Sequence, residues 1–262
     1  MSKYRYVRPE HWPSIDWEAK ARENPLLAIM TVDEMAAAPE REFSPELQAE
    51  FFDRGRKLFD KQLRAHLDEV APGALVVEYG CGAGRIMNAV IESGRRCAGI
   101  DISPTMLEFC SDLVPGADAL FLLDPHGRCE AASACAGLVY SYSVLQHIST
   151  LSAYVTALDE ICRILAPGGV AALQVNCEDF KHEAKDRLRT ENFETYSLHF
   201  RPTKSGPYKR HEQDHWSGVY IGYELLADLL AERGVAVESW RYHNPEKPRA
   251  IWVIGRKGGG HD

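Results

Sequence analysis

The stretch Val76-Val77-Glu78-Tyr79-Gly80-Cys81-Gly82-Ala83-Gly84-Arg85 decides the expected fold. The β-branched and aromatic residues over 74–79 predict a short strand, and the glycines predict a turn into a helix that starts at Arg85. Such a glycine-rich turn lets the backbone approach a bound ligand closely. The third glycine falls at position 84, so the dinucleotide pattern G-x-G-x-x-G is not met, and no Gly-Lys-Ser/Thr follows as in a P-loop.

Outward from this turn, the pattern alternates between strands and helices. Four further strands are expected at residues 97–100, 119–122, 138–142 and 170–175. Two more β-like runs, 235–242 and 250–255, predict a closing antiparallel hairpin. The fold class is therefore α/β, a doubly wound and mostly parallel seven-stranded sheet that helices cover on both faces.

The remaining segments are expected to be additions to one domain over residues 44–262. Residues 1–43 predict an N-terminal extension or cap, with a short helix over 17–28. Ser44-Pro45-Glu46 predicts the start of an amphipathic helix that ends at Pro72-Gly73. Residues 178–218 interrupt the pattern with eight acidic and eight basic side chains, which predicts an insertion or lid at the acceptor site.

Composition excludes several classes of protein. The 262 residues carry a net charge of −8, which disfavours a nucleic-acid or anionic-membrane partner because both need a cationic footprint. No apolar run is long enough to span a membrane, and the N-terminus lacks the apolar region of a signal peptide. Seven cysteines without a C-x-x-C pair indicate reduced thiols and a cytoplasmic protein.

Four ordered motifs carry a family resemblance. Glu78-x-Gly80-x-Gly82-x-Gly84 resembles the first motif of the class I S-adenosylmethionine (SAM)-dependent methyltransferases. Gly99-Ile100-Asp101-Ile102-Ser103 is similar to the second strand of that family, with its acidic end. Residues 139–148 are similar to the fourth-strand motif, and residues 165–169 to the turn before the fifth strand. The chain also loosely resembles bacterial small-molecule and sugar O-methyltransferases in general character.

The resemblance implies SAM as the cofactor and assigns residues to it. Asp101 follows Gly80 by 21 residues, at the end of the adjacent strand, where a carboxylate accepts both ribose hydroxyls. Glu78 is expected to orient the glycine loop or to contact the cofactor's ammonium group. Asp124 either contacts the adenine amino group or forms an ordinary turn. The expected cofactor-binding residues are Glu78, Gly80, Cys81, Gly82, Gly84, Arg85, Asp101, Ile102, Met106, Asp124 and Ser141.

His147 is the candidate catalytic residue. It follows the fourth strand, at the edge of the sheet where ligands bind in such folds. An imidazole titrates near neutral pH and suits a general base toward a hydroxyl acceptor. The alternative is a packing or hydrogen-bonding role in its turn. Cys81 is not expected to be a nucleophile, because the sequence indicates no partner base nearby.

The acceptor site is expected to involve aromatic and neutral polar residues, namely Tyr142, Tyr196, His199, His211, His215 and Trp216. These suit an uncharged, hydroxylated small molecule such as a sugar or glycoside, and they suit a phenol equally well. An acidic acceptor would use arginines such as Arg201 and Arg210. A solvated lid without a ligand role is the alternative for the insertion. His211, Asp214 and His215 have metal-ligand spacing, so a divalent ion such as Mg²⁺ is compatible but not favoured.

Other functions stay open at this stage. They are an N- or carboxyl-methyltransferase of a small metabolite, a nicotinamide-dependent oxidoreductase, a non-catalytic SAM-binding protein, and a protein or RNA methyltransferase. The misplaced third glycine counts against the oxidoreductase. A homodimer is compatible with the sequence.

Overall fold

The strands of the sheet are set out in a computed structural model that describes residues 17–23, 25, 43–148, 150–177, 194–199, 215–245 and 250–259, the side chains of 194–199 and 215–218 excepted. The strands are β1 (Leu75–Tyr79), β2 (Cys97–Asp101), β3 (Ala119–Leu122), β4 (Ala136–Ser141), β5 (Leu165–Asn176), β8 (Val235–Tyr242) and β9 (Ala250–Lys257). The described residues place them in one sheet with the order β3-β2-β1-β4-β5-β9-β8.

The strand directions confirm the predicted fold class. Neighbouring strands among β1 to β5 run parallel, and β9 runs antiparallel to both β5 and β8. The chain order reverses between β1 and β4, which lie side by side although β2 and β3 follow β1 in sequence. In open α/β sheets, ligands bind outside the carboxyl ends of the strands at such a switch point.

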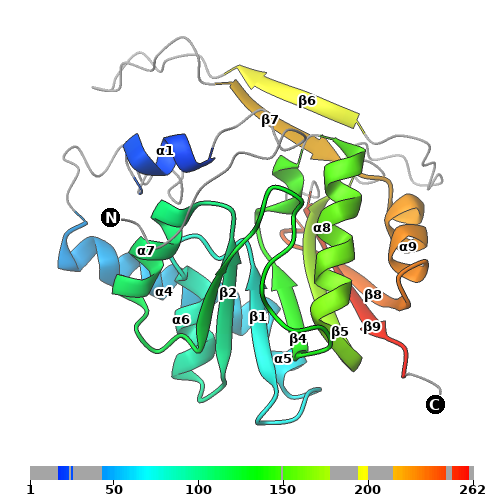
Figure 1. The fold of residues 1–262 in the computed structure, drawn as a ribbon, viewed down its shortest axis with the longest axis horizontal. Coiled ribbons are helices and arrows are strands. Elements are labelled where there is room, and N and C mark those ends of the chain that lie inside the picture. The colour runs from blue at the N-terminus through cyan, green and yellow to red at the C-terminus, as the bar shows by residue number, and fades with distance from the viewer. Residues whose placement is uncertain are drawn as a thin grey trace.

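Helices cover both faces of the sheet (Figure 1). One buried cluster packs α4 (Pro45–Gln62), α5 (Arg64–Leu67), α6 (Arg85–Glu92) and α7 (Pro104–Leu113) on one face. The other cluster packs α8 (Leu151–Ile164) and α9 (Tyr223–Ala231) on the opposite face. The predicted cap at Ser44 is present, because its hydroxyl oxygen accepts the Leu47 N–H at 3.3 Å.

Some element boundaries differ from the expectation. The helix expected to run from Ser44 to Pro72-Gly73 is broken at Leu63, where φ is −123°. The Gln62 carbonyl accepts a hydrogen bond from Arg241 of β8. In a continuous helix, this carbonyl would instead accept a backbone N–H from the next turn. The fourth and fifth strands begin earlier than expected, because Leu165 pairs with Ala136 across a β-bulge.

Four elements lie above the carboxyl ends of the parallel strands (Figure 1). They are α1 (Trp17–Glu23), the short 3₁₀ helix η1 (Leu145–His147) and a separate antiparallel pair, β6 (Glu194–His199) with β7 (His215–Tyr220). The pair lies within and just beyond the expected insertion, and β7 packs against η1. Described segments from residues 1–43 and from around residues 178–218 therefore lie at this edge of the sheet.

The seven cysteines all lie in the described ranges, and all are free thiols, five of them buried. In the ranges that the structure describes, every helix is too short or too polar to span a lipid bilayer.

Candidate functional site

The glycine loop between β1 and α6 has no room for a Cβ atom at Gly80 or Gly84. Gly80 and Gly84 have φ angles of +80° and +75°, in the left-handed region that favours glycine. A Cβ on Gly80 would lie 2.2 Å from Val144 Cγ2, and one on Gly84 would lie 2.8 Å from Cys110 Sγ. The loop is thus pressed between the turn after β4 and helix α7, which explains why both positions need glycine.

Asp101, at the end of β2, is tied to this loop. Its Oδ2 accepts the Gly82 N–H at 2.8 Å, and its Oδ1 accepts the Ser103 N–H at 2.9 Å. Burial raises the pKa of Asp101, while these backbone hydrogen bonds oppose the shift. A carboxylate offers about four lone-pair sites. Asp101 therefore keeps capacity to accept two hydroxyl groups, as the ribose of an adenosine ligand requires.

Glu78 is buried beneath the loop. Its Oε2 accepts the Tyr140 hydroxyl at 2.9 Å and the Met87 N–H at 3.1 Å. Burial raises the pKa of Glu78 to about 8. Because Met87 lies in the first turn of α6, these contacts join that turn to β4. Both side-chain contacts of Glu78 are thus to α6 and β4, the helix that follows the glycine loop and the strand beside β1.

The other expected cofactor residues surround the loop. Met106 is buried, Ile102 is partly buried, and Ser141 Oγ donates to the Tyr79 carbonyl at 2.9 Å, which ties β4 to β1. Cys81 is buried, and its hydrogen bond with Cys110 together with burial raises the pKa of its thiol. A raised pKa leaves little thiolate, in keeping with the expectation that Cys81 is not a nucleophile.

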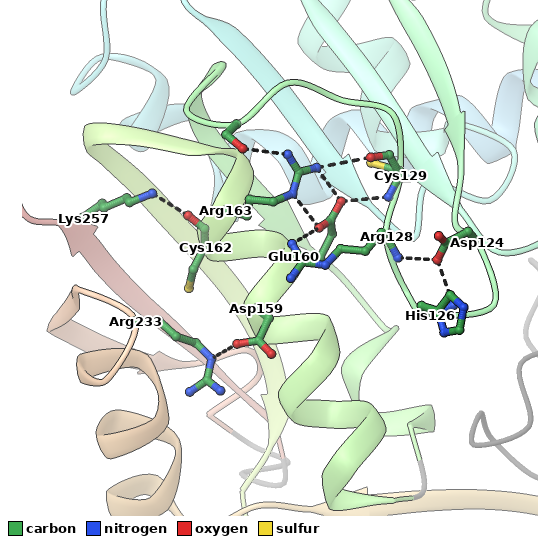
Figure 2. Close-up of polar contacts among 11 residues, drawn as sticks. Asp124, His126, Arg128, Cys129, Asp159, Glu160, Cys162, Arg163, Arg233 and Lys257 are labelled. Atoms are coloured by element: carbon green, nitrogen blue, oxygen red, sulfur yellow. Dashed lines mark hydrogen bonds and ion pairs between the residues drawn. The ribbon is translucent and has the colours of Figure 1, made fainter.

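Asp124 forms a turn after β3. Its Oδ1 accepts the backbone N–H groups of His126 at 2.8 Å and Arg128 at 2.9 Å. Figure 2 shows this turn beside Glu160 of α8, which accepts the Cys129 N–H at 2.9 Å. The geometry fits the turn-forming alternative for Asp124.

His147 lies in η1 and is 4% exposed. Its Nε2 lies 3.3 Å from Nε2 of Gln146. The Gln146 amide also donates to Ser143 Oγ at 3.1 Å and accepts from Gln174 Nε2 at 3.4 Å. Gln174 in turn accepts the Ser143 N–H at 2.8 Å.

This chain of contacts assigns the orientation of each amide and the tautomer of His147. The backbone N–H of Ser143 can only donate, so the Gln174 oxygen faces it and the Gln174 nitrogen faces Gln146. The Gln146 nitrogen then faces His147 Nε2, which accepts. The hydrogen bonds therefore favour a neutral imidazole protonated at Nδ1.

Tyr142, the first residue after β4, lies in an aromatic group. Its ring stacks on Trp252 with centroids 5.9 Å apart and lies 5.4 Å from the His243 ring. The Trp252 indole N–H, which can only donate, is 3.2 Å from His243 Nδ1. The guanidinium carbon of Arg85 lies 5.8 Å from the Tyr142 centroid and 5.6 Å from that of Phe51.

The predicted acceptor residues of the insertion are only partly described. The backbones of Tyr196, His199, His215 and Trp216 lie in β6 and β7, where His199 pairs with His215. His211 and Asp214 fall outside the described residues. Within the described ranges, no group of three or more His, Cys, Asp or Glu side chains could hold a metal ion.

Sequence reasoning missed Gln174 and Ser143. Gln174 is 3% exposed in a strand that reads AALQVN, and a buried amide within an apolar run was a signal that could have found it. Ser143 has a φ of +58°, a backbone conformation that could not be predicted from the sequence.

Residues 77–173 match a family described as Methyltransferase domain. The fold is also that of solved methyltransferases. One is the 1,6-didemethyltoxoflavin-N1-methyltransferase of Burkholderia thailandensis, with bound S-adenosylhomocysteine (TM-score 0.53, 20% identity, 79% of this chain and 78% of that chain). Another structure of this fold is the PH0226 protein of Pyrococcus horikoshii (TM-score 0.58, 14% identity, 82% and 92%). Residues 77–173 thus match a methyltransferase domain, and the sheet has the class I SAM-dependent methyltransferase fold that the sequence indicated, a class whose cofactor is SAM.

Two curated relatives are similar over part of their length. The mouse tRNA (carboxymethyluridine(34)-5-O)-methyltransferase ALKBH8 is 29% identical over 47% of this chain and 18% of its own length. The trans-aconitate 2-methyltransferase of Azoarcus sp. is 31% identical over 47% of this chain and 46% of its own length. The chain therefore spans less than half the length of these relatives.

Proposed function

We propose that this protein transfers the methyl group of SAM to an oxygen atom of a small-molecule acceptor. The observation that carries the proposal is the meeting of the glycine loop, Asp101 and the His147 turn at the switch point of the sheet. When bound, SAM supplies a methyl group activated on a sulfonium. In the proposal, the glycine loop cradles the cofactor, Asp101 binds its ribose and Glu78 orients the loop.

An uncharged hydroxyl acceptor, of the kind that a saccharide offers, is supported by the groups beside His147. Gln146, Gln174 and Ser143 bring amide and hydroxyl groups to this edge without a net charge. Such groups pair with hydroxyls. In this proposal, Nε2 of His147 takes the hydroxyl proton as general base, after the acceptor displaces the Gln146 amide. Residues 1–43 then act as a cap, and residues 178–218 as the lid of the acceptor site.

A carboxylate acceptor is the second candidate, because the positive charge of Arg85 would attract it. Among the described residues, its guanidinium contacts two aromatic rings and pairs with no carboxylate. Carboxymethyluridine and trans-aconitate, which the names of the two relatives mention, both carry carboxyl groups. A carboxylate is already ionised at neutral pH and needs no general base.

The pH dependence of turnover separates the two candidates. The test compares wild type with His147→Ala, Arg85→Gln and His126→Ala, an exposed control, on saccharides, polycarboxylates and unfractionated tRNA. For a hydroxyl acceptor, kcat/KM falls as acid protonates the base, and His147→Ala lowers it by about 10²- to 10⁴-fold. For a carboxylate acceptor, His147→Ala leaves the rate near wild type and Arg85→Gln raises KM. Methylation of tRNA alone would contradict the small-molecule proposal.

A further inference from the structure

Glu18 of α1 is a carboxylate buried far from its neighbours in sequence. It is 2% exposed, and it contacts the start of α7, more than 80 residues further along the chain. Its Oε2 accepts the Ser103 hydroxyl at 2.6 Å and the Thr105 N–H at 3.2 Å, and its Oε1 accepts the Thr105 hydroxyl at 2.8 Å. Arg22, one turn later on α1, pairs with the same carboxylate at 2.5 Å.

The position of this carboxylate follows from the needs of a helix end. The first N–H groups of a helix have no partner within it, and the dipole there favours negative charge. In α7, Ser103 Oγ accepts the Met106 N–H at 3.1 Å, and Glu18 accepts the Thr105 N–H. Glu18 thus completes the cap that Ser103 begins, and it fixes α1 to the first turn of α7.

Ser103 links Glu18 to the expected ribose carboxylate. Its backbone N–H donates to Asp101 Oδ1 at 2.9 Å, while its hydroxyl donates to Glu18. The other oxygen of Asp101 accepts the Gly82 N–H of the glycine loop. One hydrogen-bonded path therefore runs from α1 through Ser103 and Asp101 to Gly82.

Two other contacts place α1 across the candidate site. Ala21 is fully buried in a cluster with Ala83 of the glycine loop and Met106 of α7. At the start of the helix, the Trp17 ring meets the His147 ring edge to face, with centroids 5.2 Å apart. Figure 1 shows α1 above α7, over the carboxyl edge of the sheet. The helix therefore spans from the adenosine side of the site to the candidate base.

We propose that Glu18 is a positioning residue that clamps α1 over the cofactor site, so that SAM enters and the product leaves only when this clamp opens. The proposal rests on the proposed SAM-binding function. Glu18 acts through Ser103 and Asp101 and through the placement of α1. Its loss is expected to speed cofactor exchange, whereas loss of the exposed Glu23 on the same helix leaves exchange unchanged.

The test measures S-adenosylhomocysteine binding to the full chain. Wild type, Glu18→Ala, Glu18→Gln and the control Glu23→Gln are compared by titration calorimetry and by stopped-flow displacement. Glu18→Ala removes the hydrogen bonds to Ser103 and Thr105 and is expected to weaken binding by about tenfold or more, through faster dissociation. Glu18→Gln keeps an oxygen acceptor, so its dissociation rate is expected to lie between those of wild type and Glu18→Ala. Hydrogen exchange of residues 17–23 in wild type is expected to slow on binding.

The outcomes separate the two proposals. If wild type binds no S-adenosylhomocysteine, the proposed function fails, and the clamp fails with it. If wild type binds and Glu18→Ala releases the ligand as slowly as wild type, the clamp alone is contradicted. If the thermal transition of Glu18→Ala shows that this variant is poorly folded, the amide hydrogen exchange of wild type decides instead. Exchange over 17–23 that stays unchanged when the ligand binds contradicts the clamp, and slowed exchange supports it.

Discussion

The side-chain oxygen of Gln174 on β5 accepts the backbone N–H of Ser143, just beyond the end of β4, at 2.8 Å. Ser143 has a φ of +58°, which an L-residue other than glycine adopts at a cost of about 1 kcal/mol or more. Strained residues of this kind persist where surrounding contacts hold them, and they cluster at functional sites. Gln174 therefore holds the turn that carries Gln146 and His147.

Replacing Gln174 is expected to alter both stability and the state of His147. Gln174→Leu leaves the Ser143 N–H without its acceptor and is expected to lower the free energy of unfolding by about 1–3 kcal/mol. Gln174→Glu keeps that acceptor but cannot donate to Gln146, so the Gln146 amide turns its oxygen toward His147. The imidazole proton then moves to Nε2, which ¹⁵N NMR of the ring detects. An unchanged Nδ1–H tautomer in Gln174→Glu would contradict the assigned network.

Gly80→Ala is expected to be far more damaging than Gly94→Ala. Both glycines have similar φ angles, +80° and +82°, so the backbone strain is matched. A Cβ at Gly80 meets Val144 at 2.2 Å, whereas one at Gly94 meets nothing within 4 Å. We expect Gly80→Ala to cost at least about 2 kcal/mol more in denaturant unfolding, and Val144→Ala to restore part of that loss in the double variant. Equal costs for the two alanines would rule out the steric account.

The buried Glu78 is expected to make stability depend on pH. Its pKa rises from 4.5 to about 8 on folding, so the folded chain holds a proton that the unfolded chain releases. The stabilisation is full below about pH 4.5 and is lost as the pH rises toward 8, with a slope of about 1 kcal/mol per pH unit. Glu78→Gln cannot titrate, so the difference in unfolding free energy between it and wild type should carry this slope. A difference that is flat over this range would show that Glu78 is ionised when folded.

The placement of the glycine loop beside Asp101 was predictable, because these parts are close in sequence or repeat a known spacing. The glycine positions reflect a local turn, and Asp101 ends the strand that parallel pairing places beside β1. The break at Leu63 was not predictable, because the Gln62 carbonyl beside it is bonded by Arg241 of β8, from a distant part of the chain. Asp124 could not be decided from sequence either, since a carboxylate before proline suits both a turn and a ligand contact.

The residues that hold the site in place were harder to find. From the sequence, Glu18 is one of several charged residues on a short helix. Only the packing of α1 on α7 shows that its side chain is buried. Gln174 contacts a backbone N–H 31 residues away, in a turn where Ser143 adopts a positive φ. Periodicity reports which face of an element is buried, but not which polar group a buried side chain meets.

The loop after β3 is expected to depend on Glu160, which is fully buried and faces Arg163 at 2.6 Å and the Cys129 N–H at 2.9 Å (Figure 2). Burial raises the pKa of Glu160, but the hydrogen bonds from Arg163 and Cys129 outweigh it and lower the pKa. We expect Glu160→Gln to cost about 3 kcal/mol at neutral pH, since it leaves the Arg163 guanidinium without its ionised partner.

The neighbouring Asp159→Asn is the matched control for Glu160→Gln, because the two carboxylates are adjacent on α8 but differ in exposure. Asp159 pairs with Arg233 at 2.7 Å and is 42% exposed, so its loss is expected to cost less than about 1 kcal/mol. The extra cost of Glu160→Gln should be present above about pH 4.5 and should vanish as the pH falls, because a lowered pKa stabilises the ionised form. Hydrogen exchange at the Cys129 amide, measured in both variants, reports the loop directly. Equal unfolding free energies and equal exchange in the two variants would mean that the loop is held by other contacts.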